Sequence, residues 1–195
     1  MTPDMALREL KEGNERFVSG KMLRCDLMKQ VLDTANQQSP IAALVGCIDS
    51  RVPPEMVFDQ DIGDIFSARI AGNFVNTDII GSLEFATKLA GAKLIVVLGH
   101  TNCGAVKGAV DDAKMGNLTA TLANIRPSLA KLNYVGVPSS KNKELVQKVA
   151  DQNAKDAARM IMDKSEVIAT LVKEGKLKIV AAMHDISTGT VSWFG

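Results

Sequence analysis

The chain has 195 residues, 46% of them hydrophobic and 23% charged, which is the composition of an ordinary globular protein with room for one sizeable core. Lys and Arg number 23 against 22 Asp and Glu, and aromatic residues make up only 4%, so the sequence offers neither a basic surface nor a stacking platform for nucleic acid. No apolar stretch reaches the roughly 18 residues of a membrane-spanning helix, so a membrane is not an expected partner either.

The N-terminal segment "MTPDMALRELKEGNERFVSGK" predicts a helix, with Thr2 as N-cap, Pro3 in the first turn and Gly20 just past the end. The segment is charged throughout and lacks the apolar core of a signal peptide, which favours a cytoplasmic protein. A periplasmic location is the alternative, because a removed leader replaced by an initiator Met would leave the same sequence.

The rest of the chain alternates short apolar runs with segments of helical periodicity. In chain order, the pattern predicts a strand at 41–46, a strand at 64–70, a helix at 77–91 ending at Gly91, a strand at 93–99, a helix at 103–114, a mostly helical region from about 118 to 174 with a break at 134–140, a strand at 176–185 and an edge strand at 190–194. This order indicates an α/β fold with a mostly parallel central sheet flanked by helices and an antiparallel C-terminal edge strand. We expect a single domain over 1–195 with an N-terminal helical arm.

Two of these strands are followed by side chains that bind metals. Cys47 follows the strand at 41–46, His100 follows the strand at 93–99, and Cys103 comes three residues later. Ligands of open α/β sheets bind beyond the carboxyl ends of the strands, so these three side chains converge if the two strands are neighbours. Two thiolates and one imidazole suit zinc and leave a fourth position open, as in catalytic sites. The remaining cysteine, Cys25, lies in a charged, loop-like stretch and is expected to be a bystander.

An acid–base pair lies close to the first of these residues. Two thiolates offset the charge of Zn²⁺, so such a metal acidifies bound water less than a three-histidine site does. Asp49 and Arg51 lie two and four residues past Cys47, and an arginine can hold a carboxylate ionised in bidentate fashion. That carboxylate could accept a hydrogen bond from zinc-bound water. The alternatives are a purely structural ion pair, or Asp49 itself occupying the fourth zinc position.

The stretches "CIDSRVPPE" and "GHTNCGAV", with "GDIFSARIAGN" and "GSLEFA" between them, resemble the β-class carbonic anhydrases, and the similarity extends from "KEGNERFVSG" to "IVAAMHDISTGTV". The resemblance implies one Zn²⁺ per chain held by Cys47, His100 and Cys103, with Asp49 and Arg51 as the catalytic dyad. It also implies a homodimer or a dimer of dimers with active sites across the dimer interface. The residues that the resemblance implies in the substrate pocket are Gln38, Phe66, Phe85 and Gly104.

The activity implied by the resemblance is that of a zinc lyase, the reversible hydration of carbon dioxide to bicarbonate and a proton by metal-bound hydroxide. Two other functions stay open at this point. One is a zinc hydrolase of carbon disulfide or carbonyl sulfide on the same scaffold, and the other is a zinc-bound scaffold without turnover.

The sequence departs from the family pattern at three positions, none of them a zinc ligand or a member of the dyad. Ile70 replaces a usual Asn, Phe85 a common Tyr, and His184 a frequent Tyr. Family members that are regulated by a closed, Asp-ligated zinc carry a Trp three residues before the first ligand, where this chain has Leu44, so we expect the open form. His184 either shuttles protons or packs at a strand end.

Overall fold

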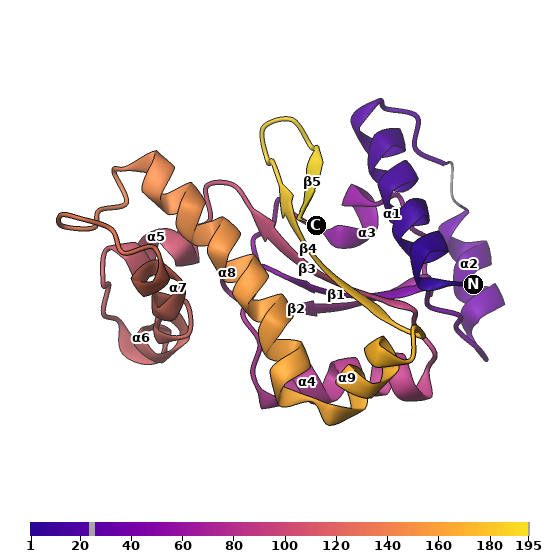
Figure 1. Cartoon of the computed structure of the whole chain (residues 1–195). Coiled ribbons are helices and arrows are strands. Elements are labelled where there is room, and N and C mark those ends of the chain that lie inside the picture. Colours follow the sequence, from indigo (N-terminus) through magenta and orange to yellow (C-terminus); the bar gives the residue numbers. More distant parts are fainter. Residues whose placement is uncertain (24–25, 195) are drawn as a thin grey trace.

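The computed structural model describes residues 1–23 and 26–194, so Cys25 lies outside the described residues. Within them, the centre of the molecule is a sheet with the strand order β2-β1-β3-β4-β5 (Figure 1). The strands are β1 Ala42–Gly46, β2 Ile65–Arg69, β3 Leu94–His100, β4 Lys178–His184 and β5 Val191–Phe194. The first four run parallel, and β5 pairs with β4 in the antiparallel direction. The predicted fold class, including its antiparallel edge strand, is confirmed.

Helices cover both faces of this sheet. One face packs against α1 (Pro3–Val18) and the short α3 (Pro54–Val57). The other face packs against α4 (Thr77–Glu84), the π-helical turn η1 (Phe85–Leu89), α8 (Lys143–Lys164) and α9 (Glu166–Lys173) (Figure 1). Strands β1 and β3 are therefore buried on both sides, as their continuous apolar runs predicted.

A third group of helices extends past the end of the sheet at which β1 and β3 terminate. It consists of α5 (Gly104–Val110), α6 (Gly116–Ala123) and α7 (Arg126–Lys131), packed on the first half of α8 (Figure 1). The predicted break at 134–140 is the connection between α7 and α8. The predicted helix at 77–91 is correct in extent, but it ends in the π-helical turn rather than in regular α-helix. No helix of the described residues is long and apolar enough to cross a membrane.

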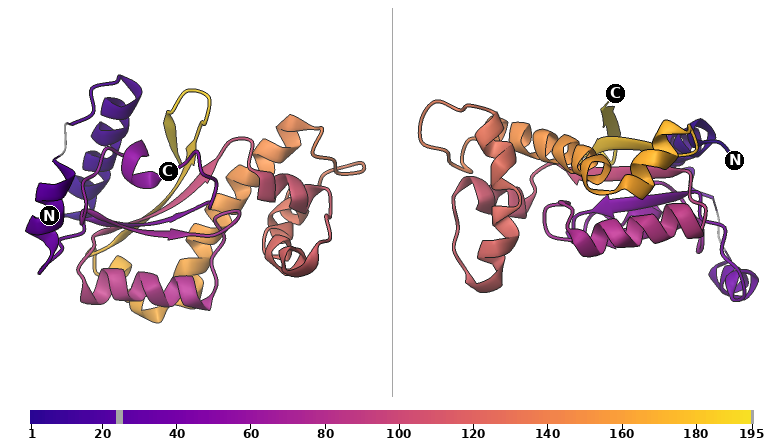
Figure 2. Two further views of the ribbon diagram at one scale, coloured as in Figure 1. Left: turned by 180° about the vertical axis from the view of Figure 1, so that it is seen from behind. Right: turned by 60° about the horizontal axis from the view of Figure 1, so that its bottom comes forward.

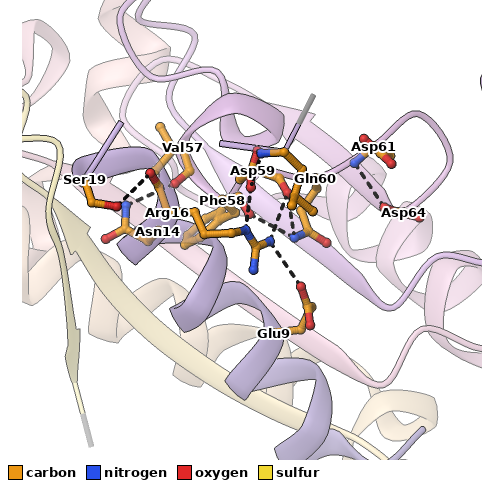
Figure 3. A network of polar contacts seen from close by, with 11 residues as sticks. Glu9, Asn14, Arg16, Ser19, Val57, Phe58, Asp59, Gln60, Asp61 and Asp64 are labelled. Atoms are coloured by element: carbon orange, nitrogen blue, oxygen red, sulfur yellow. Dashed lines mark hydrogen bonds and ion pairs between the residues drawn. The ribbon is translucent and has the colours of Figure 1, made fainter. Parts of the chain in front are cut away.

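Polar contacts fix α1 against the sheet and against the segment after α3 (Figure 3). The predicted cap is present, since the Thr2 hydroxyl accepts from the Met5 N–H at 3.2 Å. The buried Asn14 amide donates to the carbonyls of Val57 and Gly189 at 3.0 and 2.9 Å and accepts from the N–H of Val191 at 2.9 Å. Asn14 thus connects α1 to the edge strand β5.

A second contact in the same network binds α1 and the segment after it to Asp59. Arg16 donates to the Asp59 carboxylate at 2.5 Å (Figure 3). That carboxylate also accepts from the N–H of Leu23 at 3.2 Å. Asp59 is buried, and a buried charge is costly unless it is paired. The ion pair with Arg16 supplies that partner. The bonds to Asp59 tie Leu23, which lies after α1 and before α2 (Leu27–Thr34), to the segment after α3.

Candidate metal centre

Three buried side chains from two neighbouring strands meet at the carboxyl end of the sheet. Cys47 follows β1, His100 is the last residue of β3, and Cys103 is the N-cap residue of α5. Because β1 and β3 pair in parallel, their ends lie side by side. One ligand atom of each side chain lies within 4.8 Å of the others, and the two sulfur atoms are 3.9 Å apart. The structure therefore brings together the three residues that the sequence singled out.

The donor set of this cluster fits zinc. The Nδ1 atom of His100 donates to the carbonyl of Thr101 at 2.9 Å, which fixes the ring and leaves Nε2 as the nitrogen free to bind a metal. Nε2 is buried and has no hydrogen-bond partner within the described part of the chain. A buried, unpartnered imidazole nitrogen beside two thiols is costly unless a cation occupies the space between them. Two thiolates and one imidazole are a zinc donor set with one position left for a non-protein ligand.

The two thiols are electrostatically linked. Either thiol can donate to the other across the 3.9 Å between the two sulfurs, and this contact is the main reason why the pKa of Cys47 is lowered to about 4. The same bond, together with burial, raises the pKa of Cys103. A metal held here would take both sulfurs as thiolates, so its binding would release the thiol protons.

Asp49 is held at the rim of this cluster by Arg51. The guanidinium donates to both carboxylate oxygens, at 2.9 and 2.6 Å, and the Arg51 backbone N–H donates at 3.0 Å. These bonds hold the pKa of Asp49 well below its usual range, with the Arg51 side chain as the largest cause. One carboxylate oxygen lies 3.9 Å from Nε2 of His100. Asp49 is thus ionised, turned towards the cluster and paired with Arg51, and the open form of the zinc site stays a prediction.

Two residues that the sequence analysis did not assign to the site support this loop. Arg69, at the end of β2, donates to the carbonyl of Cys47 at 2.9 Å and to the carbonyl of Asp49 at 2.5 Å. The N–H of Gly72 lies 3.4 Å from the sulfur of Cys47 and donates to it. Both belong to the stretch "GDIFSARIAGN", so the motif that carried the family resemblance also contained this supporting layer.

The four expected pocket residues are not gathered at the metal centre of a single chain. Gly104 is next to it, as the first residue of α5 after Cys103. Phe66 and Phe85 line a cavity of about 720 Å³ along β2 and α4, with ring centroids 6.2 Å apart, and the lining of that cavity contains none of the three candidate ligands. Gln38 is exposed and lies beside Gly63, before β1.

His184 lies beside the candidate ligand His100. The two residues are paired in the register of β3 and β4. His184 is 2% exposed, its ring nitrogens have no hydrogen-bond partner among the described residues, and burial lowers its pKa. Such burial gives the ring no direct contact with bulk water, which favours the packing interpretation over proton shuttling.

Comparison with known proteins places the chain among one group of enzymes. The family model described as carbonic anhydrase matches residues 42–191. Carbonic anhydrase 2 of Mycobacterium tuberculosis is 33% identical, and the alignment covers 96% of this chain and 90% of that protein. The carbonic anhydrase of Mycolicibacterium smegmatis is 32% identical, with 97% and 92% covered. In the crystal structure of the β-carbonic anhydrase CafA of Aspergillus fumigatus, 25% identical, 89% of that chain and 98% of this one superpose with a TM-score of 0.75.

Proposed function

We propose that this chain, which belongs to the β-class carbonic anhydrases and is therefore a lyase, hydrates carbon dioxide reversibly to bicarbonate and a proton at one zinc ion held by Cys47, His100 and Cys103. The observation that carries the proposal is the convergence of two buried thiols and a free imidazole nitrogen beside an ionised carboxylate. When bound, zinc supplies the Lewis acidity that makes water nucleophilic near neutral pH.

The residues around this centre orient the attacking water. The Asp49 carboxylate faces the cluster and, being ionised, would accept a hydrogen bond from a water at the metal and so orient that water for attack on carbon dioxide. Arg51 occupies both carboxylate oxygens, so Asp49 cannot turn further inwards without breaking a bidentate pair. Arg69 ties the carbonyls of Cys47 and Asp49 to the end of β2, which keeps the loop in one position.

A second copy of this chain is proposed to complete the pocket. Carbon dioxide is small and apolar, and the apolar side chains Phe66 and Phe85 lie along β2, the edge strand of the sheet, outside their own chain's metal centre. An edge strand is where a second sheet can approach. In such a dimer, Phe66, Phe85 and Gln38 of each copy would face the metal centre of the other.

The arm helix α2 supports this assembly. It has only eight residues, none of them buried, and it projects from the body of the molecule (Figure 2), with Gln30 accepting from the N–H of Ile62 at 3.1 Å. Its exposed apolar side chains are Leu27, Met28, Val31 and Leu32. A helix of this length is marginal in water unless tertiary packing stabilises it, and a row of exposed apolar side chains marks an interaction surface. A second copy supplies the cover that this chain does not.

We predict that Met28→Lys/Leu32→Lys lowers both assembly and activity. These side chains, 67% and 71% exposed in the single chain, lie one helical turn apart. Burial of one such side chain stabilises by about 1.5–3 kcal/mol. A symmetric dimer would lose four of them, so the variant should become monomeric by light scattering. Its rate of carbon dioxide hydration in stopped-flow measurements should fall at least roughly tenfold, because each pocket then lacks the other copy's side chains.

The matched control is Val135→Lys/Val137→Lys, which places two lysines at 93% and 89% exposed valines in the loop between α7 and α8. This variant should keep the assembly and rate of the original protein. Full activity in a monomer would contradict the shared pocket. Absence of carbon dioxide hydration in a zinc-loaded dimer of the original sequence would contradict the proposed function itself.

A further inference from the structure

Helix α8 carries one buried amide in a stripe that is otherwise apolar. Asn153 is 2% exposed and lies in the middle of the helix. The other buried residues of this helix are Leu145, Val146, Val149, Ala150, Ala154, Ala157 and Ile161. Asparagine is a poor helix former, and an amide taken out of water destabilises unless it is hydrogen-bonded. A buried amide at this position is therefore expected to have a hydrogen-bond partner.

That partner is the loop that follows β2. The Asn153 amide nitrogen donates to the carbonyl of Gly72 at 2.8 Å, across 81 positions of sequence. Gly72 has a φ of +86°, and a Cβ atom there would lie 2.4 Å from the Ile125 side chain and 3.2 Å from that of Ala105. Only glycine fits this conformation and this space. The loop thus passes closely between α8 and the helices after the metal centre, and Asn153 fixes its carbonyl.

Gly72 also contacts the metal centre, through its backbone N–H. The Gly72 N–H donates to the sulfur of Cys47 at 3.4 Å. Asn153, Gly72 and Cys47 therefore form a continuous line of hydrogen bonds from the core of α8 to a candidate zinc ligand. The Ile70 N–H, bonded to the carbonyl of Gly46 at 3.0 Å, anchors the near end of the loop to β1. Asn153 anchors its far end.

A hydrogen bond to a ligand thiolate changes how much electron density the sulfur donates to the metal. Two thiolates offset the charge of Zn²⁺ and weaken its effect on water. An N–H donor withdraws electron density from the sulfur and orients its lone pairs, in the way that hydrogen bonds to cluster sulfurs tune other metal centres. With zinc bound, the bond from Gly72 to Cys47 would partly restore the Lewis acidity that the second thiolate removes.

We propose that Asn153 is a positioning residue of the metal centre, which holds Gly72 so that its N–H donates to the Cys47 sulfur. The inference rests on the proposed zinc site and deepens it. Asn153 touches neither substrate nor metal and acts through Gly72. A merely structural role, in which the amide satisfies a buried carbonyl and nothing more, would affect stability but not the properties of the bound metal.

The test compares Asn153→Leu with Ser128→Ala. Leucine nearly matches asparagine in size but cannot donate to Gly72. Ser128 is equally buried at 2% exposure and also loses one hydrogen bond, to Asp156 at 2.7 Å, at the contact between α7 and α8. The readouts are the zinc dissociation constant, measured by competition with a chelator, and the thiolate-to-cobalt charge-transfer absorption of the Co²⁺-substituted protein. Both are independent of activity.

Asn153→Leu is expected to weaken zinc binding about 10- to 100-fold, because the Gly72 N–H favours the thiolate form of Cys47 over the thiol and fixes the orientation of the sulfur, and loss of a group behind a ligand typically has an effect of this size. The charge-transfer band should shift as well, because the electron density on the sulfur changes. Ser128→Ala should lower the thermal midpoint while leaving both readouts unchanged. An Asn153→Leu protein with the zinc affinity and band of the original would overturn the inference and leave the proposed function standing. Failure of the original protein to bind zinc would instead overturn the proposed function.

A measurement on the unmodified chain covers the case in which Asn153→Leu does not fold. In the ¹¹³Cd-substituted, ¹⁵N-labelled protein, the Gly72 amide proton should exchange slowly and show scalar coupling to the metal through the Cys47 sulfur. A rapidly exchanging Gly72 amide without such coupling would overturn the inference, because the second bond of the line would then be absent.

Discussion

Replacement of Cys103 by serine should remove most of the zinc from the purified protein, whereas the original chain should carry close to one zinc ion per chain. Cys103 is buried and its sulfur is 3.9 Å from that of Cys47, so its replacement removes one of the two thiolates of the cluster. A hydroxyl is a far poorer zinc ligand than a thiolate. Zinc–ligand sets of four release about 10–16 kcal/mol, so one ligand accounts for roughly 3 kcal/mol, or about a hundredfold in affinity.

Elemental analysis after dialysis against a weak chelator measures this loss. The control is Cys25→Ser, which removes the same chemical group from a cysteine that the sequence analysis excludes from the site; its zinc content should equal that of the original chain. Full zinc in Cys103→Ser would remove Cys103 from the metal centre. Loss of zinc in both variants would mean that the measurement reports misfolding rather than ligation.

Asp49→Asn should separate the dyad from the metal. The substitution keeps the size of the side chain and removes its charge, and it leaves Cys47, His100 and Cys103 unchanged. Zinc content should therefore be preserved. The attacking water, however, loses an ionised acceptor 3.9 Å from His100 Nε2, and groups of this kind contribute about 10²–10⁴-fold to rate. We expect kcat/KM for carbon dioxide hydration to fall at least roughly tenfold in stopped-flow measurements.

Arg51→Ala should slow the reaction for a different physical reason. The guanidinium makes two of the three hydrogen bonds that hold the Asp49 carboxylate. Without them the carboxylate can turn onto the metal and block the open position.

Added bicarbonate or higher pH should not restore the activity of Asp49→Asn, because that variant has no carboxylate to accept the hydrogen bond from the attacking water. Turnover of Asp49→Asn at the original rate, with zinc bound, would show that the pair is structural.

The convergence of the ligands could be predicted from the sequence because each ligand follows an apolar strand. The runs at 41–46 and 93–99 are buried on both faces, and parallel neighbours bring Cys47 and His100 to one edge. Cys103 lies only three residues after His100, so the turn that leads into α5 brings its sulfur back to the same edge. Local pattern and general topology therefore determined the cluster, while Asp49 and Arg51 followed from their closeness to Cys47.

The contact between Asn153 and Gly72 behind the metal centre could not be predicted in the same way. Asn153 lies in a long helix and reaches Gly72 across the core, and no local pattern marks a polar residue in an apolar stripe as a partner of a distant loop. The helix α2 was not predicted, because its eight residues are too few for a clear helical period. The π-helical turn at Phe85–Leu89 likewise shows no sequence signal that differs from ordinary helix.

Zinc titration of the metal-free protein, followed at each step by stopped-flow carbon dioxide hydration, tests the proposed chemistry most directly. Activity should be negligible without metal, rise linearly with added zinc and reach a plateau at one zinc ion per chain. Hydration of carbon dioxide at the plateau should be faster than hydrolysis of carbonyl sulfide or carbon disulfide. Zinc binding at that stoichiometry without carbon dioxide hydration, or with faster turnover of either sulfur compound, would contradict the proposal that this metal centre hydrates carbon dioxide.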